Sequence, residues 1–252
     1  MSRRLARLAR HWGRLGDRDP LWAVYVAPDT KDGQWQVAAF LRTGREEVNR
    51  VLDGLPRPPA GQQTALDFGC GVGRLSQALA EHFERVIGID VSAPMLERAA
   101  QLARQSPRAD RLEFVLNERA DLAVVSSGTV DLVYSSLVLQ HLPRPLAAGY
   151  LREFIRVLRP GGLVVVQVAT APTRSVKGWA FRLLPAPLIG LLQRVILRYP
   201  APMRMQAMSD RWFSAVVRAA GGQIIGATED ASYGGHWIYT RYVIAACSTA
   251  AG

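Results

Sequence analysis

Short apolar runs alternate with segments of helical spacing through the middle of the chain. Strands are expected at 64–68, 85–89, 111–116, 130–135 and 162–169, with helices at 73–83, 93–105 and 144–158 between them. Each run is too short for a helix, and each helical segment places its apolar residues on one side. Such alternation predicts an α/β fold, in which a mostly parallel sheet is covered by helices on both faces.

The alternation of strands and helices ends after Thr170. Residues 171–208 are apolar and interrupted by prolines, which indicates one or two short helices inserted before a last helix at 209–220. Two further strands, 221–229 and 236–247, are separated by a turn at Tyr233-Gly-Gly. We expect them to close the sheet as a hairpin.

The N-terminal region has a different pattern. Residues 1–16 place Leu5, Leu8, Trp12 and Leu15 at helical spacing among arginines. A membrane-surface helix or an Arg-rich presequence would show the same pattern of apolar residues and arginines. We favour a third interpretation, a helix docked on its own domain. A loop with some extended chain follows, then a helix within 34–55. Four regions are therefore expected: a helical cap or lid (1–60), a core that binds a ligand (61–170), a helical segment inserted over the ligand site (171–208), and a last helix with closing strands (209–252).

A glycine turn follows the first strand of the core. Asp67 ends that strand, and Gly69, Gly71 and Gly73 follow at every second position before the next helix begins. Glycines permit a sharp reversal and let a ligand or a helix approach the backbone closely. Asp90 stands about twenty residues on, at the end of the second strand, where a ribose-binding carboxylate belongs.

The series D-F-G-C-G-V-G resembles the first motif of class I S-adenosylmethionine-dependent methyltransferases, whose pattern is acidic-x-G-x-G-x-G. VDLVYSS at 130–136 and LRPGGLVVVQV at 158–168 are similar to that family's fourth and fifth strand signatures. The resemblance implies a Rossmann-like three-layer sandwich, a mostly parallel seven-stranded sheet with an antiparallel closing strand, and S-adenosylmethionine as cofactor.

The resemblance also implies roles for individual residues. Asp90 would bind the ribose hydroxyls, Arg74 would assist the glycine loop in holding the methionine carboxylate, and Asp67 would attract the methionine ammonium. Adenine contacts would come from Val91 and Met95, or Met95 would belong to the core. The implied cofactor-binding set is Asp67, Gly69, Gly71, Gly73, Arg74, Asp90, Val91, Met95, Asn117, Glu118, Arg119, Ser135 and Gln140, and Tyr134, Ser136 and His141 would also face the methionine and the methyl.

Composition narrows the class of protein. The net charge of +10 would suit nucleic-acid binding, but only Lys31 and Lys177 are lysines, and this arginine bias is also typical of a GC-rich genome. Nucleic acid is therefore not the expected partner. Cys70 and Cys247 are too few for a disulfide framework or a thiol-rich metal site and fit the cytoplasm. No apolar run has the length of a transmembrane helix, and no secretory signal is recognised.

The segment after the fourth strand bears on the identity of the acceptor. Residues 134–142 lack the acidic ligands of metal-dependent relatives, the paired glutamates of protein-arginine enzymes and the Asn/Asp-Pro-Pro block of base-directed ones. We expect a metal-free methyltransferase acting on a small, apolar or aromatic acceptor at oxygen. His141 or His236 would be the general base, unless no protein base is used. An RNA methyltransferase and a non-catalytic cofactor-binding subunit remain alternatives, as do a homodimer and a peripheral membrane contact through the inserted segment.

Overall fold

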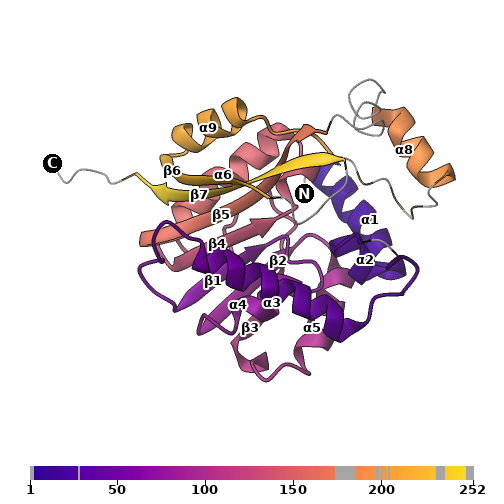
Figure 1. Ribbon diagram of the computed structural model, residues 1–252, viewed down its shortest axis with the longest axis horizontal. Coiled ribbons are helices and arrows are strands. Elements are labelled where there is room, and N and C mark those ends of the chain that lie inside the picture. Colours follow the sequence, from indigo (N-terminus) through magenta and orange to yellow (C-terminus); the bar gives the residue numbers. More distant parts are fainter. Residues whose placement is uncertain are drawn as a thin grey trace.

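The computed structural model describes residues 3–27, 29–173, 186–196, 199, 201, 203, 205–230 and 236–247. A seven-stranded sheet in the order β3-β2-β1-β4-β5-β7-β6 forms its centre (Figure 1). The strands are β1 (Thr64–Phe68), β2 (Arg85–Asp90), β3 (Leu112–Leu116), β4 (Val130–Ser136), β5 (Leu158–Pro172), β6 (Gly222–Glu229) and β7 (Trp237–Ala246). The first five strands pair in parallel, and β7 runs antiparallel to both β5 and β6. The predicted fold class is confirmed.

Helices cover both faces of this sheet (Figure 1). The helices α3 (Val37–Asp53), α4 (Arg74–Leu79) and α5 (Ala93–Ala103) lie on one face, and α6 (Arg144–Val157) and α9 (Asp210–Ala219) lie on the other. Each layer has its own apolar core: Leu75 and Leu79 of α4 belong to one, and Phe154 and Phe213 to the other. The central strands β1, β2, β4 and β5 are thus buried on both sides, as the short unbroken apolar runs predicted.

Several predicted boundaries need correction. The helix expected at 73–83 ends already at Leu79. The fifth strand begins at Leu158 rather than 162, because Leu158 pairs with Val130 before an irregularity in the register. Pro160-Gly161-Gly162 therefore lies within the irregular first part of the strand, with Gly161 at φ 79°.

The N-terminal region forms a pair of helices, α1 (Arg3–Arg18) and α2 (Pro20–Val24). The expectation of a loop after residue 16 was wrong for α2, since Pro20 occupies the first turn, where its missing N–H costs nothing. Leu5 and Leu15 of α1 are each only 2% exposed, and α1 packs against α5. The interpretation as a helix docked on its own domain is confirmed, because Leu5 and Leu15 are buried and Leu8 and Trp12 face the same domain.

A further helix, α8 (Ala186–Val195), lies in the inserted segment and projects from the edge of the body (Figure 1). Residues 174–185, which carry Trp179 and Phe181, fall outside the described residues, as do 231–235 with the expected turn at Tyr233. In the described part of the chain, no helix combines the length and apolar character needed to span a membrane.

Candidate active site

A cavity of about 590 Å³ opens at the carboxyl ends of β1, β2 and β4. Ligands of open α/β sheets bind at this edge, because the loops that leave neighbouring strands diverge there. Its walls come from the glycine loop, from α1 and α2, and from residues around α8 and the start of β7. Segments far apart in the sequence therefore enclose one space.

The glycine loop forms one wall of the cavity. Gly71 adopts φ 53°, a left-handed conformation that favours glycine, and a Cβ there would lie 2.4 Å from Cγ2 of Val24 on α2. At Gly69 an added Cβ would lie 2.4 Å from Cγ2 of Val138. These two glycines thus make room for neighbouring side chains of the protein as well as baring backbone to the cavity.

Asp90 is half-buried at the end of β2 and lines the cavity. Its carboxylate accepts N–H bonds from Gly71 and Ser92, each at 2.9 Å. Burial raises the pKa of Asp90, and the backbone donors oppose that shift. Because each carboxylate oxygen can accept more than one hydrogen bond, the bound N–H groups orient Asp90 and leave it able to accept two hydroxyls.

The predicted adenine side of the site is assembled around Asp90. Val91, Met95 and Asn117 all line the cavity, and Met95 is also packed into the core between α1, α2 and α5. Asn117 is buried and turned back on its own loop, donating to the carbonyl of Asp121 at 2.9 Å and accepting from the N–H of Arg119 at 3.1 Å. Its side chain therefore shapes the loop.

Several predicted site residues lie elsewhere. Ser135 is buried and donates to the Phe68 carbonyl at 3.2 Å, and Glu118 and Arg119 are exposed, with Arg119 paired to Asp121. A Cβ at Gly73 would meet the Phe114 ring at 3.0 Å, so this glycine serves the contact between the loop and β3. Six of the residues predicted for the site do not line the cavity: Asp67, Gly73, Glu118, Arg119, Tyr134 and Ser135.

Asp67 is buried beneath the glycine loop. It accepts a hydrogen bond from Ser76 Oγ at 2.6 Å. Burial raises its pKa to about 7, and the hydroxyl bond and the nearby Arg74 charge only partly offset this. Because Ser76 lies in α4, directly after the glycine loop, this hydrogen bond joins the end of β1 to the helix that follows the loop.

Arg74 lines the cavity from the start of α4, and its guanidinium is held by a buried ion pair. It donates to Glu47 of α3 at 2.8 Å and lies 4.8 Å from the ring centre of Tyr25. Tyr134 also donates to Glu47, at 3.2 Å. Glu47 had no signal in the sequence, because its partners are 27 and 87 residues away along the chain.

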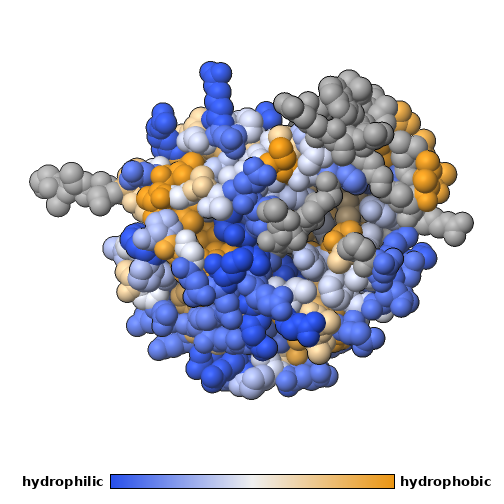
Figure 2. Space-filling model, viewed as in Figure 1, coloured by the Kyte–Doolittle hydropathy of each residue, from blue (hydrophilic) through white to orange (hydrophobic). Residues whose placement is uncertain are grey.

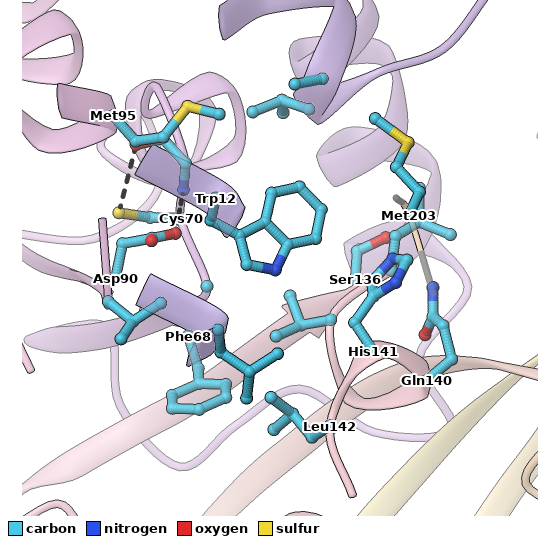
Figure 3. A pocket seen from close by; sticks show the side chains of 18 of the residues that line it. Trp12, Phe68, Cys70, Asp90, Met95, Ser136, Gln140, His141, Leu142 and Met203 are labelled. Atoms are coloured by element: carbon cyan, nitrogen blue, oxygen red, sulfur yellow. Dashed lines mark hydrogen bonds between the residues drawn. The ribbon is translucent and has the colours of Figure 1, made fainter. Parts of the chain in front are cut away.

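The opposite end of the cavity contains His141 and Trp12. Figure 3 shows Trp12 projecting into the space, with Asp90, Cys70 and Met95 on one side and His141 on the other. The two rings meet edge to face, with centroids 5.1 Å apart. Gln140 beside them is buried, and in the described part of the structure its Oε1 has no hydrogen-bond partner. Such an atom is costly unless a ligand or water satisfies it.

A connected group of polar side chains lies where β4, β5 and β7 meet. Ser136 donates to Gln167 at 2.8 Å, Gln167 donates to Asp230 at 2.8 Å, and Asp230 pairs with Arg241. Ser136 lines the cavity, as do His236 and Tyr239. Burial raises the pKa of Tyr239 to about 12, so this phenol stays neutral near pH 7. The predicted His236 is thus brought to the same cavity as His141.

Some lining residues were absent from the predicted site. Trp12 was expected in the lid above the acceptor pocket but was not among the predicted site residues, and Leu137, Tyr150 and Tyr239 were not singled out. Leu137 adopts φ 62°, which is strained for a branched side chain and often marks a functional site. Neither Leu137 nor the adjacent Ser136 and Val138 is a residue type that predicts a positive φ.

The chain resembles known proteins over this core. Residues 65–162 match the family described as "Methyltransferase domain". A "Trans-aconitate 2-methyltransferase" of Azoarcus sp. (strain BH72) is 35% identical over 138 residues, or 53% of this chain and 50% of the relative. A "Ubiquinone biosynthesis O-methyltransferase" of Psychrobacter arcticus is 33% identical over 121 residues, or 48% of this chain and 45% of the relative. Residues 65–162 therefore form a methyltransferase domain, and S-adenosylmethionine is the cofactor that the motifs within it predict.

Solved structures resemble the whole fold. The cyclase SpnF gives a TM-score of 0.67 at 17% identity, with 96% of this chain and 97% of that chain covered. Geranyl diphosphate C-methyltransferase from Streptomyces coelicolor A3(2) gives 0.63 at 14% identity, with 97% and 98% covered. The chain nevertheless spans about half the length of the curated relatives it matches. These likenesses define the fold, which serves more than one reaction.

The cavity suits the cofactor of this domain. Asp90 offers a carboxylate with free acceptor capacity, the glycine loop bares its backbone, and Gln140 offers a buried carbonyl oxygen without a described partner. Apolar side chains of Ile89 and Met95 line the space near Asp90. Side chains and backbone groups that suit the ribose diol, the charged methionine and the flat adenine of this cofactor therefore face one cavity.

Proposed function

We propose that this chain transfers a methyl group from S-adenosylmethionine to a small, largely apolar or aromatic acceptor, at an oxygen atom and without a metal ion. One observation carries the proposal: the half of the cavity beyond the cofactor groups is walled by apolar and aromatic side chains around a histidine. Leu8, Trp12 and Leu142 contribute apolar surface there, and His141 contributes the titratable group. A flat, weakly polar molecule is complementary to such walls.

The cofactor half supplies binding and orientation. When bound, S-adenosylmethionine supplies a methyl group activated by its sulfonium. Asp90 holds the ribose hydroxyls through its carboxylate oxygens, and the N–H groups of the glycine loop favour the methionine carboxylate. The orphan Oε1 of Gln140 accepts from the methionine ammonium, which replaces the role first expected of Asp67.

The acceptor half supplies position and a base. Holding an acceptor oxygen in line at about 3 Å from the carbon it attacks provides much of the acceleration. His141 takes the hydroxyl proton as the oxygen becomes nucleophilic, and His236 on another wall of the cavity is the second candidate for this role. The metal-free assignment rests on the sequence, because residues 134–142 contain no acidic side chain to hold a metal ion.

The test is formation of S-adenosylhomocysteine by the purified chain with phenols, quinols, hydroxy-acids and RNA, with and without a chelator. We expect turnover with an apolar or aromatic hydroxyl compound, unchanged by the chelator. Turnover with RNA alone would instead establish the RNA-directed alternative. Cofactor binding without turnover of any acceptor would identify a non-catalytic subunit.

Both Cys70 and Cys247 are free thiols, and we place the protein in the reducing cytoplasm.

A further inference from the structure

The helix α8 leaves an apolar face without cover. Leu188, Leu191, Val195 and Ile196 are 41%, 56%, 68% and 67% exposed. The spacing of Leu188, Leu191 and Val195 places them on one side of the helix, and Ile196 directly follows its last residue. Figure 2 shows this orange surface at the outer edge of the molecule. Several large aliphatic side chains exposed together on one helix typically mark an interaction surface.

The other side of α8 faces the cavity. Gly190 is buried, and Gln193 is 8% exposed and lines the cavity. Gln193 also donates to the Met203 carbonyl at 3.2 Å, which fixes the helix to the chain that follows it. A surface bound by the outer face of α8 would therefore lie one helix diameter from the space proposed for the acceptor.

Charge selects the kind of partner. Residues 171–208 contain six basic residues and no acidic one, as the sequence shows. On the neighbouring α1, Arg7, Arg10, Arg14 and Arg18 are exposed at a spacing that forms one stripe. This stripe lies opposite the apolar residues of α1 that face the protein, so its guanidinium groups are available to anions.

We propose that the outer face of α8 docks on an anionic lipid surface, with its aliphatic side chains in the interface and nearby arginines at the lipid phosphates. Aliphatic side chains beside an acid-free basic segment are the two components of such binding. A second copy of the chain is a poorer occupant, because two molecules of net charge +10 would bring like charges together. The inference concerns a surface outside the catalytic cavity and stands whether or not the acceptor is as proposed.

The experiment is co-sedimentation of the full chain with vesicles of phosphatidylcholine alone or mixed with phosphatidylglycerol, at low and high salt. We expect binding only to the mixed vesicles, weakened by salt. The double variant Leu191→Glu/Val195→Glu should bind at least about tenfold more weakly, and Arg7→Gln/Arg14→Gln at least about fivefold more weakly. Val124→Glu is the matched control, since Val124 is 50% exposed in the connection between β3 and β4.

Equal binding by the α8 variant and the parent would overturn the proposal, as would equal binding to both kinds of vesicle. Thermal unfolding of each variant checks that the fold is intact, and the arginine variant tests the contribution of charge without altering α8. Loss of a dimer in the α8 variant, in a parent that does not bind vesicles, would assign the face to a second copy and refute the lipid assignment. Because vesicle binding needs no acceptor, failure here is distinguishable from failure of the proposed activity.

Discussion

The indole of Trp12 meets the imidazole of His141 edge to face across the cavity, with ring centroids 5.1 Å apart. One residue comes from the N-terminal helix α1 and the other from the turn after β4, so this contact joins the cap to the methyltransferase core. It places a flat apolar surface beside the candidate base. The contact therefore bears on both acceptor binding and the orientation of the histidine.

Trp12→Leu should raise the Michaelis constant for an aromatic acceptor about tenfold and change turnover little, because it removes stacking surface and leaves the base in place. Steady-state kinetics with the acceptor found in the screen would measure this. Trp212→Leu is the control, since Trp212 packs on α9 away from the cavity. A fall in turnover at an unchanged Michaelis constant would mean that Trp12 orients His141.

His141→Gln should lower turnover by about two orders of magnitude, the usual contribution of a positioned base, and leave cofactor affinity nearly unchanged. His82→Gln is the matched control, because His82 bonds Asn49 at 2.8 Å and does not line the cavity. Normal turnover of the His141 variant would direct attention to His236. Equal losses in turnover and in cofactor affinity would mean that His141 orients the cofactor.

Asp90→Ala should weaken S-adenosylmethionine binding by about 2–4 kcal/mol, because charge-assisted hydrogen bonds at a desolvated site are lost. Calorimetry measures the affinity. Glu113→Ala on the neighbouring strand controls for loss of an acidic group, since Glu113 pairs with Arg85 at the surface. Unchanged affinity would remove the ribose assignment.

Gly71→Ala and Gly128→Ala separate backbone strain from blockage of the cavity. Both glycines adopt a positive φ, 53° and 69°, so backbone strain alone costs either variant roughly 1–2 kcal/mol of stability. At Gly128 the nearest atom to an added Cβ is 4.0 Å away, whereas at Gly71 it is Val24 Cγ2 at 2.4 Å. We expect both variants to lose stability and only the Gly71 variant to lose cofactor affinity. Similar cofactor affinity in the two would show that the loop is not the binding wall.

Sequence reasoning reached the parts of the site that are local in the chain. Gly71 and Asp90 belong to short segments with a fixed relation to the strand ends, so their place at the cavity followed from spacing. Ser135 and Ser136 show where such reasoning stopped, because adjacent residues of one strand face opposite ways and only Ser136 lines the cavity. The pairing of Glu47 with Arg74 depends on how α3 packs against α4, and no local pattern encodes that packing.

Asp67→Asn should flatten the pH dependence of stability. The pKa of Asp67 is raised to about 7 from its ordinary value of 3.8, so the folded protein holds a proton there that the unfolded chain releases. This group therefore favours folding at low pH, and its contribution is lost as pH rises from about 4 to about 7, with a slope of at most about 1.4 kcal/mol per pH unit. Urea unfolding across that range compares the parent with the variant. A parallel pH dependence in the two proteins would mean that Asp67 is ionised when folded.

The helices α1 and α2 wall much of the cavity and yet contribute no strand to the sheet, which begins only at Thr64. Some residues that wall the acceptor half, such as Leu8 and Trp12, are therefore encoded apart from the strands, while His141 and Leu142 follow β4 in the core. Substitutions in the first forty residues can remodel the pocket while the sheet and the glycine loop stay intact. Exchange of this leading segment between relatives is accordingly a direct route to altered acceptor preference on an unchanged catalytic frame.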